Sequence, residues 1–560
     1  MSTIYEYDSR NQHGVHPYLW VSGNRVLDPF SGIELFRFTN VPSGTAAVGP
    51  KGERLIYVLG GPTSGTTETE RPTTNATWLA LWNFSAPLSM TAITASQLAH
   101  YNKTGELLGT EYDQWRPVGK TINGNDGYSW NITVPAGLRA TTANIAALDD
   151  RIIAGSGWQQ FGTAAPHGNF RLWTLSLDST RRGQLLWDIW IKPPVANATL
   201  QFGGSSYCSL EDGIFLVRVK ETRQWMGFDI NSGKQLWITD SQPQWMMYSS
   251  DAVFYNGTFY SGGYGGQVFA YDAKTGELLW TATVDAEGLE SAYERSPLSV
   301  QVVDGKVFAQ SQEHSMTNPY YRTWKVYAFD ARTGDRIWDL NGGWSGAGFA
   351  DGYRVALNYF DNQIYSIGKG PSATNVEVQN DVINHGNGVA IKGMVTDISP
   401  GTNDYSIAAR FPNGVPAIAD ESMTAWMEYV YMQKPKPADI TGVEVVINVL
   451  DPNNNTYEVG RTTSDADGMF KLSFTPQVPG EYTVIASFAG SESYWPSHAK
   501  TAIAVTEAAP QPTQQTVLAQ SSIEMYLISG VIAIIIAIAT AASAAATVMI
   551  KKTRTSPLMS

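Results

Sequence analysis

The side chains best suited to chemistry are few and scattered in this sequence of 560 residues. His13 and His16 stand three residues apart, but no third metal ligand is evident beside them, and a zinc site takes three or four. The turn 465–468, DADG, resembles the start of a calcium loop, yet Phe474 stands where such a loop needs a glutamate. We therefore predict no metal site and no catalytic residue.

Cys208 is the single cysteine of the sequence, so an intramolecular disulfide is impossible. We expect a buried structural thiol at this position. The stretch 262–267, GGYGGQ, is rich in glycine but lacks the lysine and the following helix of a phosphate-binding loop. Nucleophile and phosphate chemistry are therefore disfavoured as well.

Seven Asn-x-Ser/Thr sequons offer sites for N-linked sugars if the chain is exported. Such sugars would make the protein a surface glycoprotein. The candidate glycosylation sites are Asn75, Asn83, Asn102, Asn131, Asn197, Asn256 and Asn454.

A nine-residue pattern, Asp-x-x-Ser/Thr-Gly-x-x-x-Trp, repeats along the first part of the chain. Clean copies begin at Asp229, Asp272 and Asp330; the copy at Asp28 ends in phenylalanine, and the copy at Asp178 has one extra residue. The motif residues are Asp28, Gly32, Phe36, Asp178, Trp187, Asp229, Gly233, Trp237, Asp272, Gly276, Trp280, Asp330, Gly334 and Trp338.

Each copy has the chemistry of a β-hairpin. The Asp and Ser/Thr side chains can cap the amides of a tight turn, and the glycine supplies the positive φ that closes it. The tryptophan then reaches across to fill the gap between neighbouring units. Further strand pairs between the copies give about four strands per 45–55 residues, which is typical of a β-propeller blade. A β-sandwich with chance Asp-Gly turns is the alternative.

The pattern resembles the tryptophan-docking repeats of quinoprotein-type β-propellers, also called PQQ-like repeats. More closely, the chain resembles archaeal cell-surface proteins in which such a propeller precedes an Ig-like domain and a C-terminal membrane anchor. The further markers are IYSIGKGPSAT (364–374) and DESMTAWMEYVYMQKPKP (420–437). Members of this group generally begin with a signal peptide and extra blades, which residues 1–30 do not show. We therefore expect a propeller of about six to eight blades that is N-terminally incomplete.

The resemblance implies a quinone cofactor as one alternative. In that family the blade motif docks blades and does not bind the cofactor, while the dehydrogenases add an adjacent cysteine pair and a calcium site. A chain with Cys208 alone cannot form that pair, and nothing singles out Asp351 or Glu290 as a base. We expect no cofactor, with PQQ and calcium as the alternative.

Loops of a propeller can also form a ligand face. The segment 312–324, QEHSMTNPYYRTW, is a candidate ligand loop for glycans or peptides, with Tyr320, Tyr321 and Trp324. Packing between blades is the alternative reading of these rings.

The sequence changes character near residue 371, which divides it into domains. We predict an all-β chain with a propeller at 1–370 and an Ig-like β-sandwich at 371–507, in which Tyr482 would form a tyrosine corner. Apolar residues spaced as on a helix face predict a helical insertion near 420–434, with a strand as the rival. Residues 508–524 are rich in Pro, Gln and Ser and form a flexible tether.

Residues 525–550 carry no charge and are numerous enough to span a bilayer. Lys551, Lys552 and Arg554 follow at once, so the positive-inside rule places 551–560 in the cytoplasm and the remainder outside. We expect a single-pass protein of the cell membrane.

The net charge of −13, without a basic cluster in the first 500 residues, disfavours nucleic-acid binding. We favour a non-enzymatic role in binding or scaffolding at the cell surface: adhesion, envelope organisation or capture of a protein or glycan ligand. A quinoprotein-like oxidoreductase or a propeller hydrolase is the competing class, and an assembly scaffold for exported proteins is a third.

Overall fold

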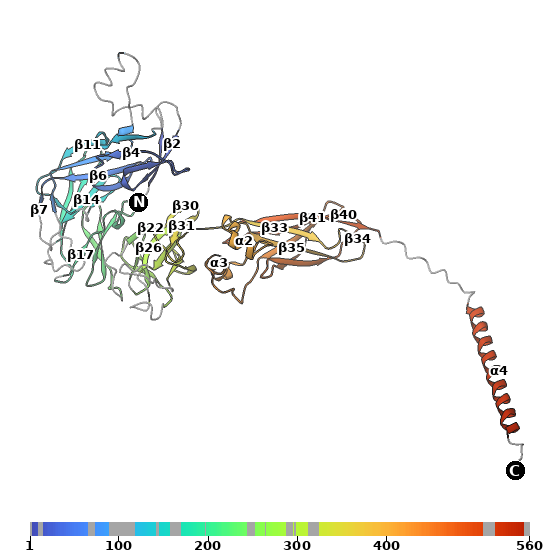
Figure 1. The fold of residues 1–560 in the computed structure, drawn as a ribbon. Coiled ribbons are helices and arrows are strands. Elements are labelled where there is room, and N and C mark those ends of the chain that lie inside the picture. The colour runs from blue at the N-terminus through green and yellow to red at the C-terminus, as the bar shows by residue number, and fades with distance from the viewer. Residues whose placement is uncertain are drawn as a thin grey trace, which may run out of the picture. The chain divides into compact units, whose positions relative to one another are not determined.

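The computed structural model describes residues 3–8, 15–64, 73–88, 103, 118–141, 145–156, 170–196, 198–243, 252–263, 265–286, 295, 298–311, 324–507 and 521–553. They form two compact units, in which strands predominate (Figure 1). The first unit consists of Met1–Gly370 together with Asp420–Asp439. The second consists of Pro371–Ala419 and Ile440–Ser560.

The first unit is a β-propeller, built from small sheets that follow one another along the chain. Four consecutive sheets keep their strands in chain order, except that β18 pairs with β19 off the main path of its sheet. Their strands are β13 (Ile145–Ala147), β14 (Arg151–Ser156), β15 (Phe170–Ser176), β16 (Leu185–Ile191); β17 (Leu200–Gln201), β18 (Cys208–Ser209), β19 (Ile214–Val219), β20 (Gln224–Asp229), β21 (Gln235–Ile238); β22 (Ala252–Tyr255), β23 (Thr258–Gly262), β24 (Gln267–Asp272), β25 (Leu278–Thr283); and β26 (Leu298–Val303), β27 (Lys306–Ser311), β28 (Lys325–Asp330), β29 (Arg336–Asn341).

The remaining sheets of this unit are less regular. The first sheet gains an extra strand, because β10 pairs in parallel with β4 along its outer edge. Within the described residues, the last sheet has three strands. The strands are β1 (Thr3–Asp8), β2 (Val15–Val21), β3 (Arg25–Leu27), β4 (Glu34–Thr39), β10 (Lys120–Asn123); β5 (Thr45–Val48), β6 (Arg54–Gly60), β9 (Trp78–Asn83), β11 (Tyr128–Thr133); β7 (Thr63–Ser64), β8 (Thr73–Asn75), β12 (Arg139–Ala140); and β30 (Gly348–Ala350), β31 (Tyr353–Asn358), β32 (Gln363–Ile367).

Burial within each regular sheet reflects its two neighbours. The third strands β20, β24 and β28 bury four consecutive residues each, so both faces of these strands are covered. The outer strands are largely exposed, as in β25. Strands buried on both faces are expected where sheets stack face to face. The core accordingly runs from sheet to sheet, since one cluster joins Phe170, Phe215 and Phe269 of three successive sheets.

Helix α3 (Met423–Met432) packs on the propeller, although in the sequence it lies between the two segments that form the second unit. Trp426 and Val430 are buried, and Gln433 ends the helix in the left-handed region at φ 57°. Thr424 Oγ1 donates to the carbonyl of Asp339 in β29 at 2.9 Å. The apolar stripe thus forms a helix rather than a strand, and it belongs to the first unit rather than to the sandwich.

The second unit contains a sandwich of two sheets, ordered β33-β35-β36 with β39 beside β35, and β34-β41-β40-β37-β38. Alternate residues of β37 and β40 are buried, as expected for strands with one face in a core. Phe474 and Tyr482 meet between the sheets, with ring centroids 5.8 Å apart. The elements are β33 (Ser372–Val378), β34 (Val382–Asn384), β35 (Val389–Asp397), α2 (Tyr405–Arg410), β36 (Val415–Pro416), β37 (Glu444–Leu450), β38 (Thr456–Thr463), β39 (Met469–Phe474), β40 (Gly480–Phe488) and β41 (Ser497–Thr506).

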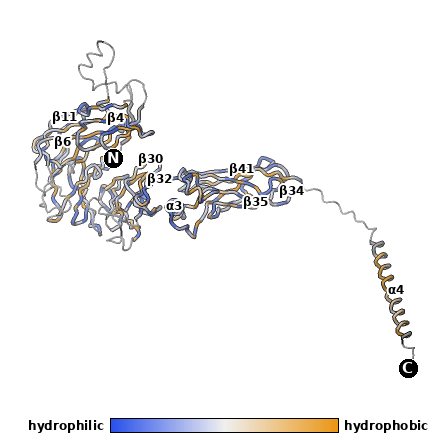
Figure 2. The backbone as a smooth tube through the Cα atoms, in the orientation of Figure 1, coloured by the Kyte–Doolittle hydropathy of each residue, from blue (hydrophilic) through white to orange (hydrophobic). Residues whose placement is uncertain are grey.

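The last element is helix α4 (Ser521–Thr553). Its stretch Met525–Ile550 has 26 residues, reaches a mean hydropathy of 2.4 in its most apolar part, and is long and apolar enough to span a membrane. Figure 2 shows this apolar character along the helix, whereas both sheet units mix polar and apolar residues.

Candidate functional site

The repeated motif forms a tight turn of the same geometry in each clean copy. Asp229 Oδ1 accepts hydrogen bonds from the amides of Asn231 at 3.0 Å and Ser232 at 2.7 Å. The amide of Gly233 donates to the Asp229 carbonyl at 2.8 Å, with φ at 71°. Asp272 and its following residues repeat this arrangement. These hydrogen bonds hold the pKa of Asp229 below its ordinary value although partial burial, the largest effect on this group, opposes them.

Three of the motif tryptophans occupy equivalent places between sheets. Each indole Nε1–H donates to the carbonyl of the residue that follows the aspartate of the next copy. The pairs are Trp187 with Ile230 at 2.9 Å, Trp237 with Ala273 at 3.2 Å and Trp280 with Ala331 at 3.1 Å. The tryptophan therefore joins one sheet to the next by a fixed hydrogen bond as well as by packing.

The glycine of the next copy leaves room for the incoming indole. A Cβ atom at Gly276 would lie 2.5 Å from the Trp237 ring, and one at Gly334 would lie 2.7 Å from Trp280. Both glycines also have positive φ, at 73° and 78°. The glycine therefore has two roles: it closes the turn, as the sequence predicts, and it makes room for the docked indole.

The last and first copies differ from the other three. No clean copy of the motif follows Trp338 in the sequence. The hairpin that follows it, β31–β32, contributes Ala356, Tyr365 and Ile367 to the cluster on which Trp338 packs. The Trp338 ring centroid lies 5.9 Å from that of Phe308, and Trp338 packs, as Met427 of α3 does, against a buried cluster that includes Trp344. Phe36 is 1% exposed and lies in the N-terminal aromatic cluster.

Most of the candidate ligand loop 312–324 lies outside the described residues. Tyr320 and Tyr321 lie outside the described residues. Trp324 is 3% exposed, and its carbonyl accepts hydrogen bonds from the amide of Gly342 and the side chain of Asn341. The Trp324 ring is thus part of the core and offers no face to a ligand.

The candidate glycosylation sites fall on different kinds of surface. Asn131, Asn256 and Asn454 are exposed, whereas Asn75 and Asn83 are half-buried. Asn102 and Asn197 lie outside the described residues.

The groups considered for metal, redox or base chemistry are dispersed. Among the described residues, no three His, Cys, Asp or Glu side chains gather as metal ligands would. Cys208 is half-buried, not fully buried as expected. Desolvation nevertheless raises the pKa of its thiol far above the ordinary value, which makes it a poor nucleophile. Asp351 lies in an exposed turn at φ 51°, and Glu290 and His13 lie outside the described residues. Asp465 caps the amides of Asp467 and Met469 within a strand-to-strand turn.

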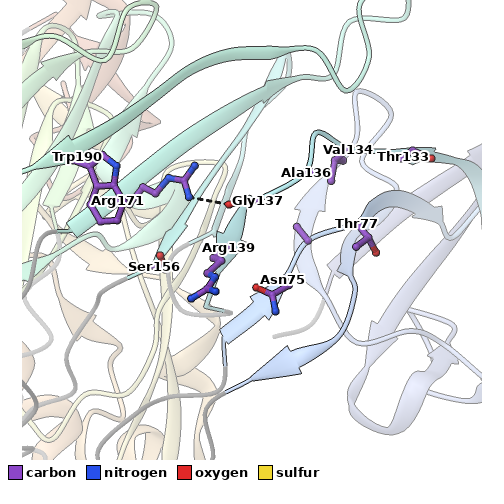
Figure 3. A pocket seen from close by; sticks show the side chains of 11 residues that line it. Asn75, Thr77, Thr133, Val134, Ala136, Gly137, Arg139, Ser156, Arg171 and Trp190 are labelled. Carbon is purple, nitrogen blue, oxygen red and sulfur yellow. Dashed lines mark hydrogen bonds between the residues drawn. The ribbon is translucent and has the colours of Figure 1, made fainter.

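A pocket of about 700 Å³ lies in the first unit, where several strand ends meet (Figure 3). Strands β8, β12, β14, β15 and β16 all contribute to its wall. The lining residues are Asn75, Ala76, Thr77, Thr133, Val134, Ala136, Gly137, Arg139, Ser156, Arg171 and Trp190.

Arg171 is the most constrained polar group of the pocket. Its Nε and Nη2 donate to the two carboxylate oxygens of Asp188 at 2.8 and 2.6 Å, and Nη1 donates to the Gly137 carbonyl at 2.9 Å. The Asp188 hydrogen bond raises the pKa of Arg171 above its ordinary value. The guanidinium carbon lies 5.6 Å from the centroid of the Trp190 ring, a cation–π contact. Arg171 therefore contacts one side of the Trp190 indole.

The remainder of the wall combines an aromatic face, uncharged polar groups and the exposed, charged side chain of Arg139. Trp190 is 61% exposed, and Asn75, Thr77 and Ser156 lie along the lining with it. Residues that alternate along β16 point to opposite faces, so Trp187 docks against the next sheet while Trp190 faces outward. The alternation along β16 could have indicated from the sequence that Trp190 is exposed. No sequence pattern, however, shows that the other strand ends of the pocket, distant along the chain, lie beside it.

The comparisons with known proteins agree with a repeat propeller. Residues 223–369 match the family model described as outer membrane protein assembly factor BamB. Residues 223–369 form a PQQ-like repeat domain. They include the clean copies at Asp229, Asp272 and Asp330.

Several solved structures are similar to this chain. The crystal structure of BamB from Moraxella catarrhalis is 16% identical, with a TM-score of 0.29, and the match covers 62% of this chain and 88% of that one. The dihydro-heme d1 dehydrogenase NirN, in complex with DHE, is 12% identical, with a TM-score of 0.34 and coverages of 72% and 71%. The computationally designed Ika8 protein is 14% identical, with a TM-score of 0.34 and coverages of 66% and 84%. No curated protein matches the chain.

Proposed function

We propose that this chain is a membrane-anchored binding or scaffolding protein of the cell surface, of the kind found on archaeal cells. The observation that carries this proposal is helix α4, in which 26 uncharged residues follow the folded units and precede Lys551 and Lys552. Such a segment anchors a chain in one membrane, and the basic flank favours the cytoplasmic side. The propeller would then face outward and take part in adhesion, envelope organisation or ligand capture.

We further propose that the second unit is an Ig-like domain that carries the propeller. Two features support this. The unit contains a two-sheet sandwich, and the Tyr482 hydroxyl donates to the Val478 carbonyl at 3.0 Å. A tyrosine bonded to the backbone a few residues upstream is a tyrosine corner. The predicted tether, residues 508–524, lies outside the described residues as far as 520, and its last four residues belong to α4.

The orientation is tested with the full chain, tagged at each end, in the membrane of living cells. Protease added to intact cells should remove the N-terminal tag and leave the C-terminal tag on a short membrane fragment. Lysed cells, in which both tags should be lost, are the control. An intact N-terminal tag on intact cells would contradict a surface role.

The binding role is tested with the full chain in detergent, immobilised and exposed to solubilised envelope. A specific protein or glycan ligand should be retained. Dye reduction after addition of PQQ and calcium would instead support the quinoprotein-like oxidoreductase.

A further inference from the structure

We propose that the pocket beside Trp190 binds an acidic saccharide: a hydroxyl-rich ring that bears one carboxylate. This inference deepens, and rests on, the proposed function, because it names a ligand class for a cell-surface protein. It is carried by the three kinds of group that meet in the pocket: an exposed indole, uncharged hydrogen-bonding side chains and one arginine available for an ion pair.

The exposed indole provides the stacking surface. Trp190 leaves 61% of its surface exposed, and the Arg171 guanidinium, itself bonded to Asp188 and Gly137, contacts its ring. A large aromatic side chain has only two χ angles to order, so it loses little entropy when a ligand packs on it. The C–H face of a sugar ring is apolar and flat enough to pack on such a ring.

The polar lining suits the hydroxyl groups of a sugar. Asn75 offers an amide that both donates and accepts, while Thr77, Thr133 and Ser156 offer hydroxyls. Asn75 and Arg139 are directly paired residues of β8 and β12, so their side chains start from adjacent places in one small sheet. The volume of about 700 Å³ would hold one or two sugar rings.

The charge balance selects a single carboxylate. Arg171 is already in a bidentate ion pair with Asp188. Arg139 is exposed and forms no ion pair within the described part of the chain. One guanidinium matches one carboxylate in a paired hydrogen-bonding geometry. On a chain with a net charge of −13, this arginine is a local attraction for an anion rather than part of a basic patch.

Such a saccharide has two sources. The first is a glycan of the surrounding envelope. The second is a sugar attached to this chain, because Asn75 and Thr77 belong to one sequon, and Thr133 belongs to the sequon of Asn131. Both sources present the same chemistry to the pocket.

The test uses the full chain in detergent, prepared in a host that adds no N-linked sugars. Glucuronic acid and its dimer are the probes, glucose and its dimer are the neutral comparison, and calorimetry with tryptophan fluorescence is the readout. We expect the acidic dimer to bind, Trp190→Ala to weaken its binding at least about tenfold, and Trp190→Tyr to retain most of it. Arg139→Gln should reduce the preference for the acid over the neutral sugar. Trp495→Ala, which changes a 53% exposed indole of the second unit, is the matched control and should bind normally.

Three results would overturn the proposal: no binding of the acidic dimer by a folded chain, unchanged binding by Trp190→Ala, or equal binding of acidic and neutral sugars with Arg139 present. Thermal melts of each variant establish that it is folded. Protein prepared in a glycosylating host separates the two sources. If the acidic dimer binds more weakly when Asn75 carries a sugar than when it does not, the chain's own sugar is identified as the ligand. Equal binding of the dimer by both forms identifies an external saccharide. A failure here leaves the protease result on membrane orientation unchanged, so the two proposals fail separately.

Discussion

At the scale of single residues, the contact between an indole and the glycine of the next repeat links sequence to architecture most directly. Trp237 lies against Gly276, and Trp280 lies against Gly334. The glycine is needed there for two independent reasons, its positive φ and the absence of space for a Cβ atom. The two reasons can be separated by experiment.

Gly276→Ala should destabilise the chain more than Gly213→Ala. Both glycines have φ 73°, but a Cβ at Gly213 meets no atom within 4 Å. The control should lose about 1 kcal/mol from the left-handed backbone alone. Gly276→Ala should lose about 1–3 kcal/mol more from the clash with Trp237. Urea unfolding measures both, and equal losses would mean that the indole does not occupy this place.

Trp237→Ala should reduce the free energy of unfolding by about 2–4 kcal/mol, since it removes a half-buried indole and leaves a cavity between sheets. The loss also includes the hydrogen bond to Ala273. Trp495→Ala, at an exposed indole, should cost less than about 1 kcal/mol. Similar losses at the two positions would contradict a docking role.

At the scale of elements, neighbouring sheets are also joined by charge. Asp285, just beyond β25, accepts from Arg336 of β29 at 2.8 Å and from Lys325 of β28 at 3.2 Å. The Arg336 hydrogen bond is the main reason why the pKa of Asp285 is lowered. Because the pKa is lower in the folded state, the stabilisation is present above the ordinary carboxyl pKa and is lost as the pH falls through the folded pKa.

Asp285→Asn should therefore cost less than about 1 kcal/mol at pH 7, as partly exposed ion pairs do. The difference from the unaltered chain should shrink below about pH 4, where the carboxylate becomes protonated. It should also shrink in about 1 M salt. Urea unfolding across this pH range measures the difference in unfolding free energy between Asp285→Asn and the unaltered chain. A difference that grows as the pH falls would contradict a stabilising, ionised Asp285.

Helix α3 is held on the propeller by a few directed contacts. The backbone N–H of Asn341 donates to Glu428 Oε1 at 2.9 Å, in addition to the hydrogen bond of Thr424 to the Asp339 carbonyl. Glu428→Ala should expose the amide and loosen the helix, which limited proteolysis would detect as faster cleavage near residues 433–439. Glu421→Ala, at an exposed carboxylate, is the control. Unchanged cleavage would show that the helix is held by packing alone.

The fold class could be predicted from the sequence, because each copy of the motif contains the residues of a tight turn and a tryptophan that packs on the neighbouring sheet. Its regularity at Asp229, Asp272 and Asp330 made the propeller visible, and the propeller prediction is confirmed. The candidate site could not be predicted, since Asn75, Arg139 and Trp190 come together through strand ends that no local pattern connects. The packing of α3 on the propeller could not be predicted either, because an amphipathic pattern does not indicate which domain the apolar face contacts.

At the scale of the whole molecule, the chain combines a propeller, a sandwich and one apolar helix in that order. The aromatic content supports this plan, with 18 tryptophans available for the joints between sheets and for the exposed pocket wall. The proposed anchor would hold this array at a membrane, where a fixed pocket can meet ligands that cannot diffuse away.

The most direct test of the account is an experimental structure of the full chain in a lipid nanodisc. We expect the indole nitrogens of Trp187, Trp237 and Trp280 to lie about 3 Å from the carbonyl oxygens of Ile230, Ala273 and Ala331, respectively. We also expect Met525–Ile550 to cross the bilayer. Three indoles in unlike environments, not repeated between neighbouring sheets, would contradict the account.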